Sequence, residues 1–253
     1  VPVLWHTPKS AGPWEKAGPR NLARWRMMHS GPLTTNLAEA GGFSRSTATL
    51  AAPDLQWHAV AAPFRKAGLA DPSVRALSVL IAGLTPASRG RIRLRSADPR
   101  HKPAIDPGYL SDGADIDPLV RGIQAAREIA GARAMARICK AELAPGPDVI
   151  TEVELREYIR RELGTLYHPV GTCAMGADAG PAARRLTSVV DPQLRVRGVD
   201  GLRVVDASVM PAVPRGNTNA PMIAIAETTA DLIIGCAPLA AIEPQARVIP
   251  ILA

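Results

Sequence analysis

Proline is the residue that most limits what this chain can form. The 253 residues include 24 prolines but only four Trp, three Tyr and two Phe. Each proline fixes one backbone dihedral and removes an N–H donor, so helices and strands must be short and joined by enforced turns. Apolar residues still make up 47% of the chain. That proportion supports a substantial core and excludes wholesale disorder.

The sequence shows no feature of a membrane, secreted or metal-binding protein. Its longest apolar runs are interrupted well before the roughly 18 residues that a membrane helix needs. Its first residues lack a basic stretch followed by an apolar one, as a signal peptide would have. The three cysteines, Cys139, Cys173 and Cys236, are widely spaced and form no CxxC pair, which favours neither a disulfide framework nor a zinc site. We therefore expect a cytoplasmic protein with no transmembrane segment and no metal.

The net charge of +7 is carried mainly by arginine, with 30 Lys and Arg against 23 Asp and Glu. Such a surplus suits a polyanionic partner, but the arginines are scattered among acids rather than grouped with aromatic residues. The densest stretch, 89–95, alternates strictly between arginine and other residues. It predicts a strand with Ile92 and Leu94 on the core face and the arginines in solvent. We therefore expect no nucleic-acid partner.

Periodicity predicts short strands and two amphipathic helices in the first two thirds of the chain. Strands are expected at 55–60 and 77–81, and a short helix at 22–28. A longer helix over 117–136 has an apolar stripe at 3.6-residue spacing, formed by Leu119, Val120, Ile123, Ala126 and Ile129. A second helix opens with the capping box Thr151-Glu-Val-Glu154. Its predicted buried side consists of Val153, Leu155, Tyr158, Ile159 and Leu163.

The last third differs in kind, because residues 164–219 are rich in Gly, Pro and Asp. One buried strand is predicted, Leu202–Val205, followed by a helix from about Pro221 to Ile234. Asn219 is the predicted N-cap of that helix, and Gly235 ends it. These changes divide the chain into a part at 1–163, a segment at 164–236 and a tail at 237–253, for which we have no functional interpretation.

Three segments could carry chemistry. The first contains His168, which precedes a proline and therefore has extended backbone geometry that fixes the direction of the imidazole. The second contains Asp206 at the carboxyl end of an apolar strand, where open α/β sheets place ligand contacts. The third, Gly216–Pro221, opens the last helix, where unpaired N–H groups favour an anion. Each segment also has a purely structural alternative. His168 could be a buried histidine with its hydrogen bonds satisfied, Asp206 could form an Asx turn, and Asn219 could simply cap the helix.

Together the three segments are more specific than any one alone. The series HPVGTCAMG, VVDPQLRVRGVDGLRVVDASVMP, GNTNAP and IAETTADLI resembles the carboxyl-terminal part of the glucose–methanol–choline oxidoreductase family. The upstream stretches LTTNLAEAGG, PDLQ, SRGR and IDPGYL resemble the substrate-domain half of that family in the same order. The resemblance covers residues 20–235, roughly, and is closest to the choline-dehydrogenase-like branch. It implies an α+β fold, with an antiparallel sheet packed by helices and carboxyl-terminal segments of an FAD-binding α/β domain.

The resemblance also implies roles for individual residues. The family histidine falls on His168, which would accept the hydroxyl proton of an alcohol as hydride leaves its carbon for flavin N5. The partner position falls on Asn217, whose amide would hydrogen-bond the alcohol oxygen. Asp206 and Ala207 match the strand end that touches the flavin nucleotide. The entrance of the last helix, beneath the isoalloxazine, falls on Thr218 and Asn219.

The chain departs from the family in one respect. It contains no GxGxxG motif, which in family members cradles the FAD pyrophosphate, and it does not begin with Met. We therefore expect the distal catalytic half of an FAD-dependent enzyme that oxidises a small alcohol to an aldehyde or ketone. Its partner would be the missing amino-terminal FAD-binding half. The alternatives are a cofactor-free, inactive fragment and a basic polyanion-binding module.

Overall fold

The computed structural model describes residues 1–8, 18–65, 68–69, 74–177 and 188–237. The chain divides into two compact units, which are described separately. Unit 1 comprises Val1–Pro169 and Ala212–Asn217, and unit 2 comprises Val170–Pro211 and Thr218–Ala253. Most of the tail considered above, residues 238–253, lies outside the described residues.

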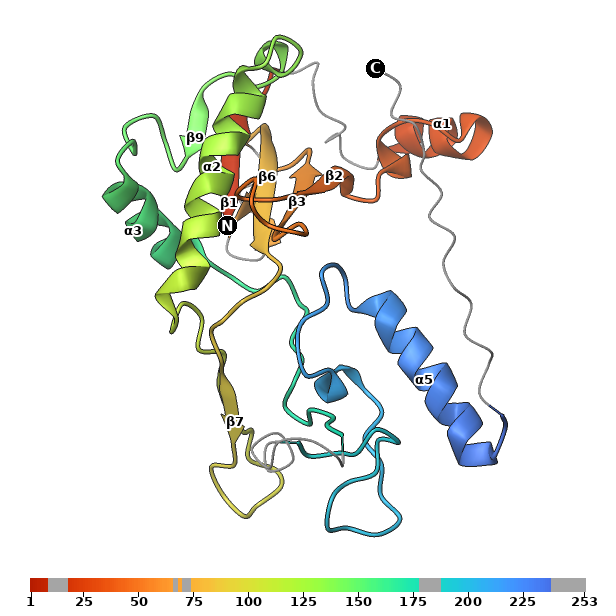
Figure 1. Ribbon diagram of the computed structural model, residues 1–253. Coiled ribbons are helices and arrows are strands. Elements are labelled where there is room, and N and C mark those ends of the chain that lie inside the picture. The colour runs from red at the N-terminus through yellow and green to blue at the C-terminus, as the bar shows by residue number, and fades with distance from the viewer. Residues whose placement is uncertain (9–17, 66–67, 70–73, 178–187, 238–253) are drawn as a thin grey trace. The chain divides into compact units, whose positions relative to one another are not determined.

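Unit 1 is built on a five-stranded sheet with the order β2-β3-β6-β1-β9 (Figure 1). All four neighbouring pairs are antiparallel. The strands predicted at 55–60 and 77–81 are confirmed as β3 and the centre of β6. The bounds are β1 Pro2–His6, β2 Ala38–Ser44, β3 Leu55–Val60, β6 Ala76–Gly83 and β9 Glu142–Ala144. The expected antiparallel α+β architecture is therefore confirmed.

Helices α2 and α3 pack on the sheet through the predicted apolar stripes (Figure 1). The α-helices among the described residues of unit 1 are α1 Pro19–Met28, α2 Ile116–Gly131 and α3 Glu152–Glu162. Helix α2 ends earlier than residue 136, and Ile129 and Val153 are exposed, so these three details of the prediction were wrong. Ile129 lies at the border of its apolar stripe, whereas Val153, two residues before Leu155, lies nearly half a turn from the buried side of α3. The core is formed by Val3, Leu4, Trp5, Leu55, Ile81, Ile116, Leu119, Val120, Ile123, Ala126, Ala130, Cys139, Ala144, Leu155, Tyr158 and Ile159.

A glycine lets helix α2 approach the sheet closely. A Cβ atom built on Gly122 would lie 2.6 Å from Cγ2 of Ile81 and 3.5 Å from Cδ1 of Leu55. Leu55 therefore faces α2. Because successive side chains of a strand point to opposite faces, Gln56 and His58 lie on the other face of the sheet.

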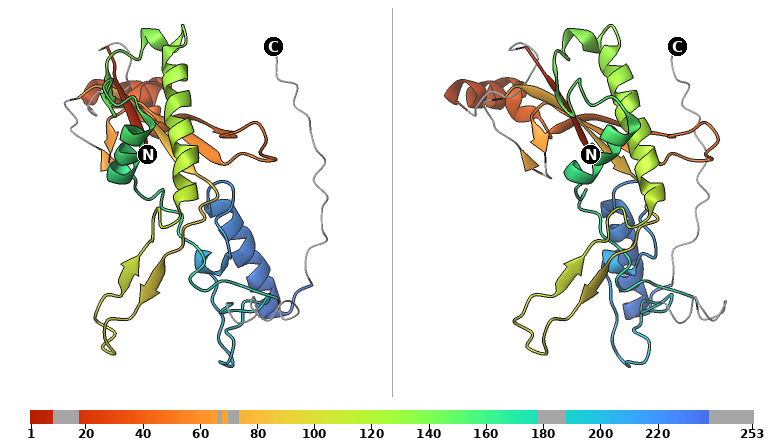
Figure 2. Two further views of the ribbon diagram at one scale, coloured as in Figure 1. Left: turned by 60° about the vertical axis from the view of Figure 1, so that its left-hand side comes forward. Right: turned by 90° about the vertical axis from the view of Figure 1, so that its left-hand side faces the viewer.

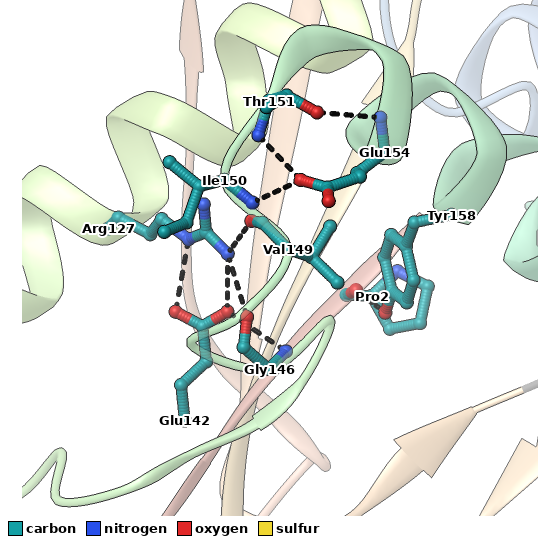
Figure 3. Close-up of polar contacts among 9 residues, drawn as sticks. All are labelled: Pro2, Arg127, Glu142, Gly146, Val149, Ile150, Thr151, Glu154 and Tyr158. Atoms are coloured by element: carbon teal, nitrogen blue, oxygen red, sulfur yellow. Dashed lines mark hydrogen bonds and ion pairs between the residues drawn. The ribbon is translucent and has the colours of Figure 1, made fainter.

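Hydrogen bonds fix the start of α3 and the loop before it (Figure 3). Thr151 Oγ1 accepts from the Glu154 backbone N–H, and Glu154 Oε2 accepts from the Thr151 N–H at 2.8 Å, so the predicted capping box is confirmed. The N–H of Thr151 also lowers the pKa of the Glu154 carboxyl. Arg127 of α2 donates to both carboxylate oxygens of Glu142 at 3.0 and 2.8 Å, and to the carbonyl of Val149. These bonds hold the chain between β9 and α3 against α2.

The arginine-rich stretch forms a two-stranded ribbon that is separate from the main sheet (Figure 2). Strand β7 Arg91–Arg93 pairs with β8 Ala104–Asp106. Ile92 and Leu94 are 51% and 85% exposed, so their predicted place on a core face is wrong. The alternation of residues correctly predicts extended backbone. It does not supply a layer to cover the apolar face, because β7 pairs with β8 alone.

Unit 2 is mainly loops around a small cluster of buried residues, Val190, Leu194 and Val209. The predicted buried strand Leu202–Val205 is wrong. Within the described part of the chain, its only β contact is an isolated bridge between Arg195 and Arg203, and both Leu202 and Val205 are exposed. A short apolar run becomes a buried strand only when neighbouring strands pair with it, and the described residues provide none.

Helix α5 Asn219–Ile234 confirms the predicted final helix. Its N-cap is Thr218 rather than Asn219, which is already the first helical residue, and Gly235 ends it with a left-handed φ of 77° as expected. Thr229 is the one residue that it buries. The exposed apolar side chains on this helix are Ile223, Leu232, Ile233 and Ile234. None of the described helices is long and apolar enough to span a membrane.

Candidate active site

Asn217 is held against strand β3 by its neighbours in sequence and by a direct hydrogen bond. The guanidinium of Arg215 donates to the carbonyl of Pro53, just before the strand. Nε2 of Gln56 donates to Oδ1 of Asn217 at 2.9 Å, although the two residues are 161 positions apart. The segment that carries Asn217 thus belongs to unit 1, and its amide meets the strand face that is turned away from α2.

His168 lies near a second residue of that face, His58. It follows α3 in unit 1 and is half-buried. Burial lowers the pKa of His58 below its ordinary value of 6.5, and the charge of His168 lowers it further. Such an effect requires the two imidazoles to be near each other. Asn217 thus contacts Gln56, and His168 lies near His58, whose side chain points to the same face of β3 as that of Gln56.

Gln56 and His58 were missed by the sequence analysis. Gln56 is buried, and its Oε1 has no hydrogen-bond partner among the described residues. Nε2 of His58 is likewise buried without a hydrogen bond in the described part of the chain. Leaving such an atom unpaired costs about 1–3 kcal/mol, so both atoms suit a polar ligand or water. Two polar residues at i and i+2 in an otherwise apolar strand were the signal that could have found them.

Unit 2 contains the residues predicted to touch the flavin nucleotide. Oδ1 of Asp206 accepts from the Ser208 N–H at 2.8 Å, which is the Asx-turn alternative considered above, and Ala207 opens the 3-10 turn η4, Ala207–Val209. The carbonyl of Ser208 accepts from the N–H groups of Gly171 and Cys173 at 3.1 and 3.0 Å. This turn is therefore fixed beside the segment that follows His168. Ser208 Oγ is buried without a hydrogen-bond partner among the described residues.

The start of α5 suits a negatively charged group. Thr218 makes no side-chain cap hydrogen bond there, and no acidic residue lies in the first turn. The N–H groups that begin at Asn219 thus lack both a side-chain cap and a nearby carboxylate, while the helix dipole is positive at this end. With the unsatisfied Ser208 Oγ, these features fit the predicted cofactor, whose reduced flavin is anionic.

Other possible sites are not supported in the described part of the chain. No group of three His, Cys, Asp or Glu residues there could hold a metal ion. An open hollow of about 340 Å³ in unit 2 is lined by Asp191 and the loop 195–203. None of the predicted site residues lines it.

Comparison with known proteins identifies the family. A family model described as GMC oxidoreductase matches residues 86–226. An alcohol dehydrogenase [acceptor] from Pseudomonas putida is 45% identical over 213 residues, 84% of this chain and 37% of the relative. An oxygen-dependent choline dehydrogenase from Brucella ovis is 38% identical over 216 residues, 85% of this chain and 38% of the relative. The chain belongs to the GMC oxidoreductase family, and it spans well under half the length of these relatives.

Solved structures give the same result. Pyridoxine 4-oxidase from Mesorbium loti superposes with a TM-score of 0.71 at 32% identity, over 82% of this chain and 40% of that one. An FAD-dependent oxidoreductase from Chaetomium thermophilum superposes with a TM-score of 0.60 at 27% identity, over 73% of this chain and 28% of that one. The expected resemblance to the carboxyl-terminal part of a flavoprotein oxidoreductase is therefore confirmed.

Proposed function

We propose that this chain is the catalytic part of an FAD-dependent enzyme that oxidises the CH–OH group of a small alcohol to an aldehyde or ketone. The proposal is supported by two neighbouring residues of β3: Gln56 donates a hydrogen bond to Asn217, and His58 has its pKa lowered by His168, although His168 and Asn217 are 49 positions apart in sequence. The alcohol dehydrogenase and choline dehydrogenase among its relatives support an alcohol as the substrate.

His168 is the proposed general base. A neutral imidazole accepts the hydroxyl proton as the C–H bond breaks, and this is the single proton that the reaction must remove. His58 lies nearby with a lowered pKa and therefore stays neutral at neutral pH. It adds no positive charge that would resist protonation of His168 as the reaction proceeds.

Asn217 is the proposed orienting residue. Its amide hydrogen-bonds the alcohol oxygen and holds the reacting carbon in place. When bound, FAD supplies the hydride acceptor, flavin N5. Asp206 and Ala207 would contact its nucleotide, and Thr218 and Asn219 would lie at its isoalloxazine. Because the chain contains no GxGxxG motif, we propose that a further, amino-terminal FAD-binding part of the enzyme supplies the pyrophosphate site.

Replacement of His168 tests the proposal. In the FAD-loaded enzyme that contains this sequence, His168→Ala removes the proton acceptor. Loss of a general base slows a reaction by about 10²–10⁴-fold, so anaerobic stopped-flow reduction of the flavin by alcohol should slow to that extent while FAD stays bound. His101→Ala, at an exposed position, is the control. An unchanged rate in His168→Ala would refute the role of His168.

A second measurement concerns cofactor retention. Asp206→Ala should weaken FAD binding far more than it slows flavin reduction in the enzyme that remains loaded. The visible absorbance of flavin after gel filtration reports retention directly. Full retention, together with a large loss of rate, would contradict the assignment of Asp206 to the nucleotide.

A further inference from the structure

We infer that Gln56 is a positioning residue that fixes the side-chain amide of Asn217 in one orientation, with its NH₂ group directed to the ligand. The effect on the reaction rate rests on the proposed function. The direction of the hydrogen bond between the two amides can be measured without it.

The contact is built from buried and anchored parts. Gln56 is 6% exposed. It lies in strand β3, which is flanked in the five-stranded sheet by β2 on one side and β6 on the other. Asn217 is brought to it by a segment that a second hydrogen bond, from Arg215 to the carbonyl of Pro53, fastens to the start of the same strand. The geometry of the pair is thus set by the sheet rather than by a loop alone.

The chemistry of the two amides makes the contact directional. A side-chain amide has an acceptor end, the oxygen, and a donor end, the NH₂ group. Because Nε2 of Gln56 donates to Oδ1 of Asn217, the acceptor end of Asn217 is occupied. Rotation of the Asn217 amide alone by half a turn, with Gln56 unmoved, would place two NH₂ groups against each other and leave a buried donor unpaired, which is unfavourable.

The orientation of the Asn217 amide determines whether it offers a ligand a hydrogen-bond donor or an acceptor. Nδ2 of Asn217 makes no hydrogen bond to any described residue, and the side chain is exposed. It therefore offers hydrogen-bond donors to an oxygen atom. The oxygen of an alcohol gains negative charge as its proton leaves, so a donor there stabilises the charge that develops in the reaction. An acceptor at the same place would oppose it.

The orientation is testable in the 253-residue chain without cofactor. We expect hydrogen exchange at Nε2 of Gln56, followed by NMR, to be slowed by its hydrogen bond, and exchange at Nδ2 of Asn217 to be faster. Asn217→Ala should remove the protection of Gln56. If the Asn217 NH₂ is the protected group, the pair is reversed and the inference is overturned.

Substitution of Gln56 by Glu supplies the kinetic test in the FAD-loaded enzyme. Below its pKa the introduced carboxyl group is protonated and donates to Oδ1 of Asn217, as Gln56 does. Above its pKa it only accepts, and the Asn217 amide must turn. We therefore expect flavin reduction, relative to the unmodified enzyme, to fall by about 10- to 100-fold as pH rises through that pKa, as expected for loss of one hydrogen bond to a charged group.

Two variants separate this effect from simple disruption. Gln56→Met removes the hydrogen bond at similar volume and should give a loss that does not change with pH relative to the unmodified enzyme. Gln124→Glu makes the same chemical change at an exposed position of α2 and should change nothing. If Gln56→Glu and Gln56→Met show the same pH profile, the inference is overturned. If His168→Ala does not slow flavin reduction, the proposed function is contradicted. The hydrogen-exchange result for the Gln56–Asn217 pair does not depend on that rate and tests the inference separately.

Discussion

Helices α2 and α5 are both 16 residues long, yet they are covered very differently. Helix α2 buries seven residues against the sheet of unit 1, whereas α5, in unit 2, buries Thr229 alone although most of its residues are apolar. Unit 1 thus builds its core from its own strands and helices. Unit 2 keeps its segments in place mainly through backbone hydrogen bonds and the small apolar cluster of Val190, Leu194 and Val209. Length and apolar content alone therefore do not determine whether a helix is buried.

Amide hydrogen exchange should give the largest difference between the two helices. Protection in a folded core approaches the global free energy of unfolding, while uncovered segments open locally. With a global stability of about 5 kcal/mol or more, we expect the central amides of α2 to exchange roughly a thousand-fold more slowly than those of α5. Exchange of the 253-residue chain followed by mass spectrometry measures both at once. Equal protection would mean that α5 is covered in solution.

A matched pair of isoleucine substitutions should give the next largest effect. Ile123 in α2 is fully buried, whereas Ile233 in α5 is 58% exposed. Ile123→Ala should lower the free energy of unfolding by about 2–5 kcal/mol because it leaves a cavity in the core. Ile233→Ala should change it by less than about 0.5 kcal/mol. Urea denaturation followed by circular dichroism compares them. A comparable loss in Ile233→Ala would contradict the contrast drawn between the helices.

The smallest expected effect is electrostatic and lies within unit 1. Burial is the larger cause of the lowered pKa of His58, and the charge of His168 is the smaller. We therefore expect His168→Ala to raise the pKa of His58 part of the way toward 6.5, as followed by NMR titration. His101→Ala, on the exposed loop between β7 and β8, should leave it unchanged. No change in His168→Ala would mean that the two imidazoles are not close.

The same shift has a consequence for stability. Between the lowered pKa of folded His58 and its unfolded value of 6.5, the unfolded chain binds more protons than the folded one. Stability therefore rises with pH across that window and is lost as pH falls through it. The stability of His58→Gln should depend less on pH over the same range.

The features that the sequence could predict are those determined locally. The stripe from Leu119 to Ala126 and the capping box of Thr151 and Glu154 depend on residues within a few positions, and both are confirmed. The burial of Ile92 and the strand at Leu202–Val205 were predicted wrongly, because both depend on which layers or strands lie beside these residues. The contact between Gln56 and Asn217 joins residues 161 positions apart, and no local pattern encodes it. Sequence analysis therefore proposed His168 and Asn217 as site residues but not the strand residues Gln56 and His58 beside them.

The glycine at position 122 permits a close approach of α2 to strand β6. A Cβ atom at position 122 would lie 2.6 Å from Cγ2 of Ile81, so any larger residue there would have to displace that side chain of β6 or move α2 away from it. Strand β6 pairs with β3 at Ile81–Trp57 and Ala82–Gln56, so we expect a displacement of Ile81 to disturb the contact between Gln56 and Asn217. We therefore expect the geometry of the candidate site to depend on Gly122, a residue in the apolar layer on the opposite side of the sheet from Gln56 and Asn217.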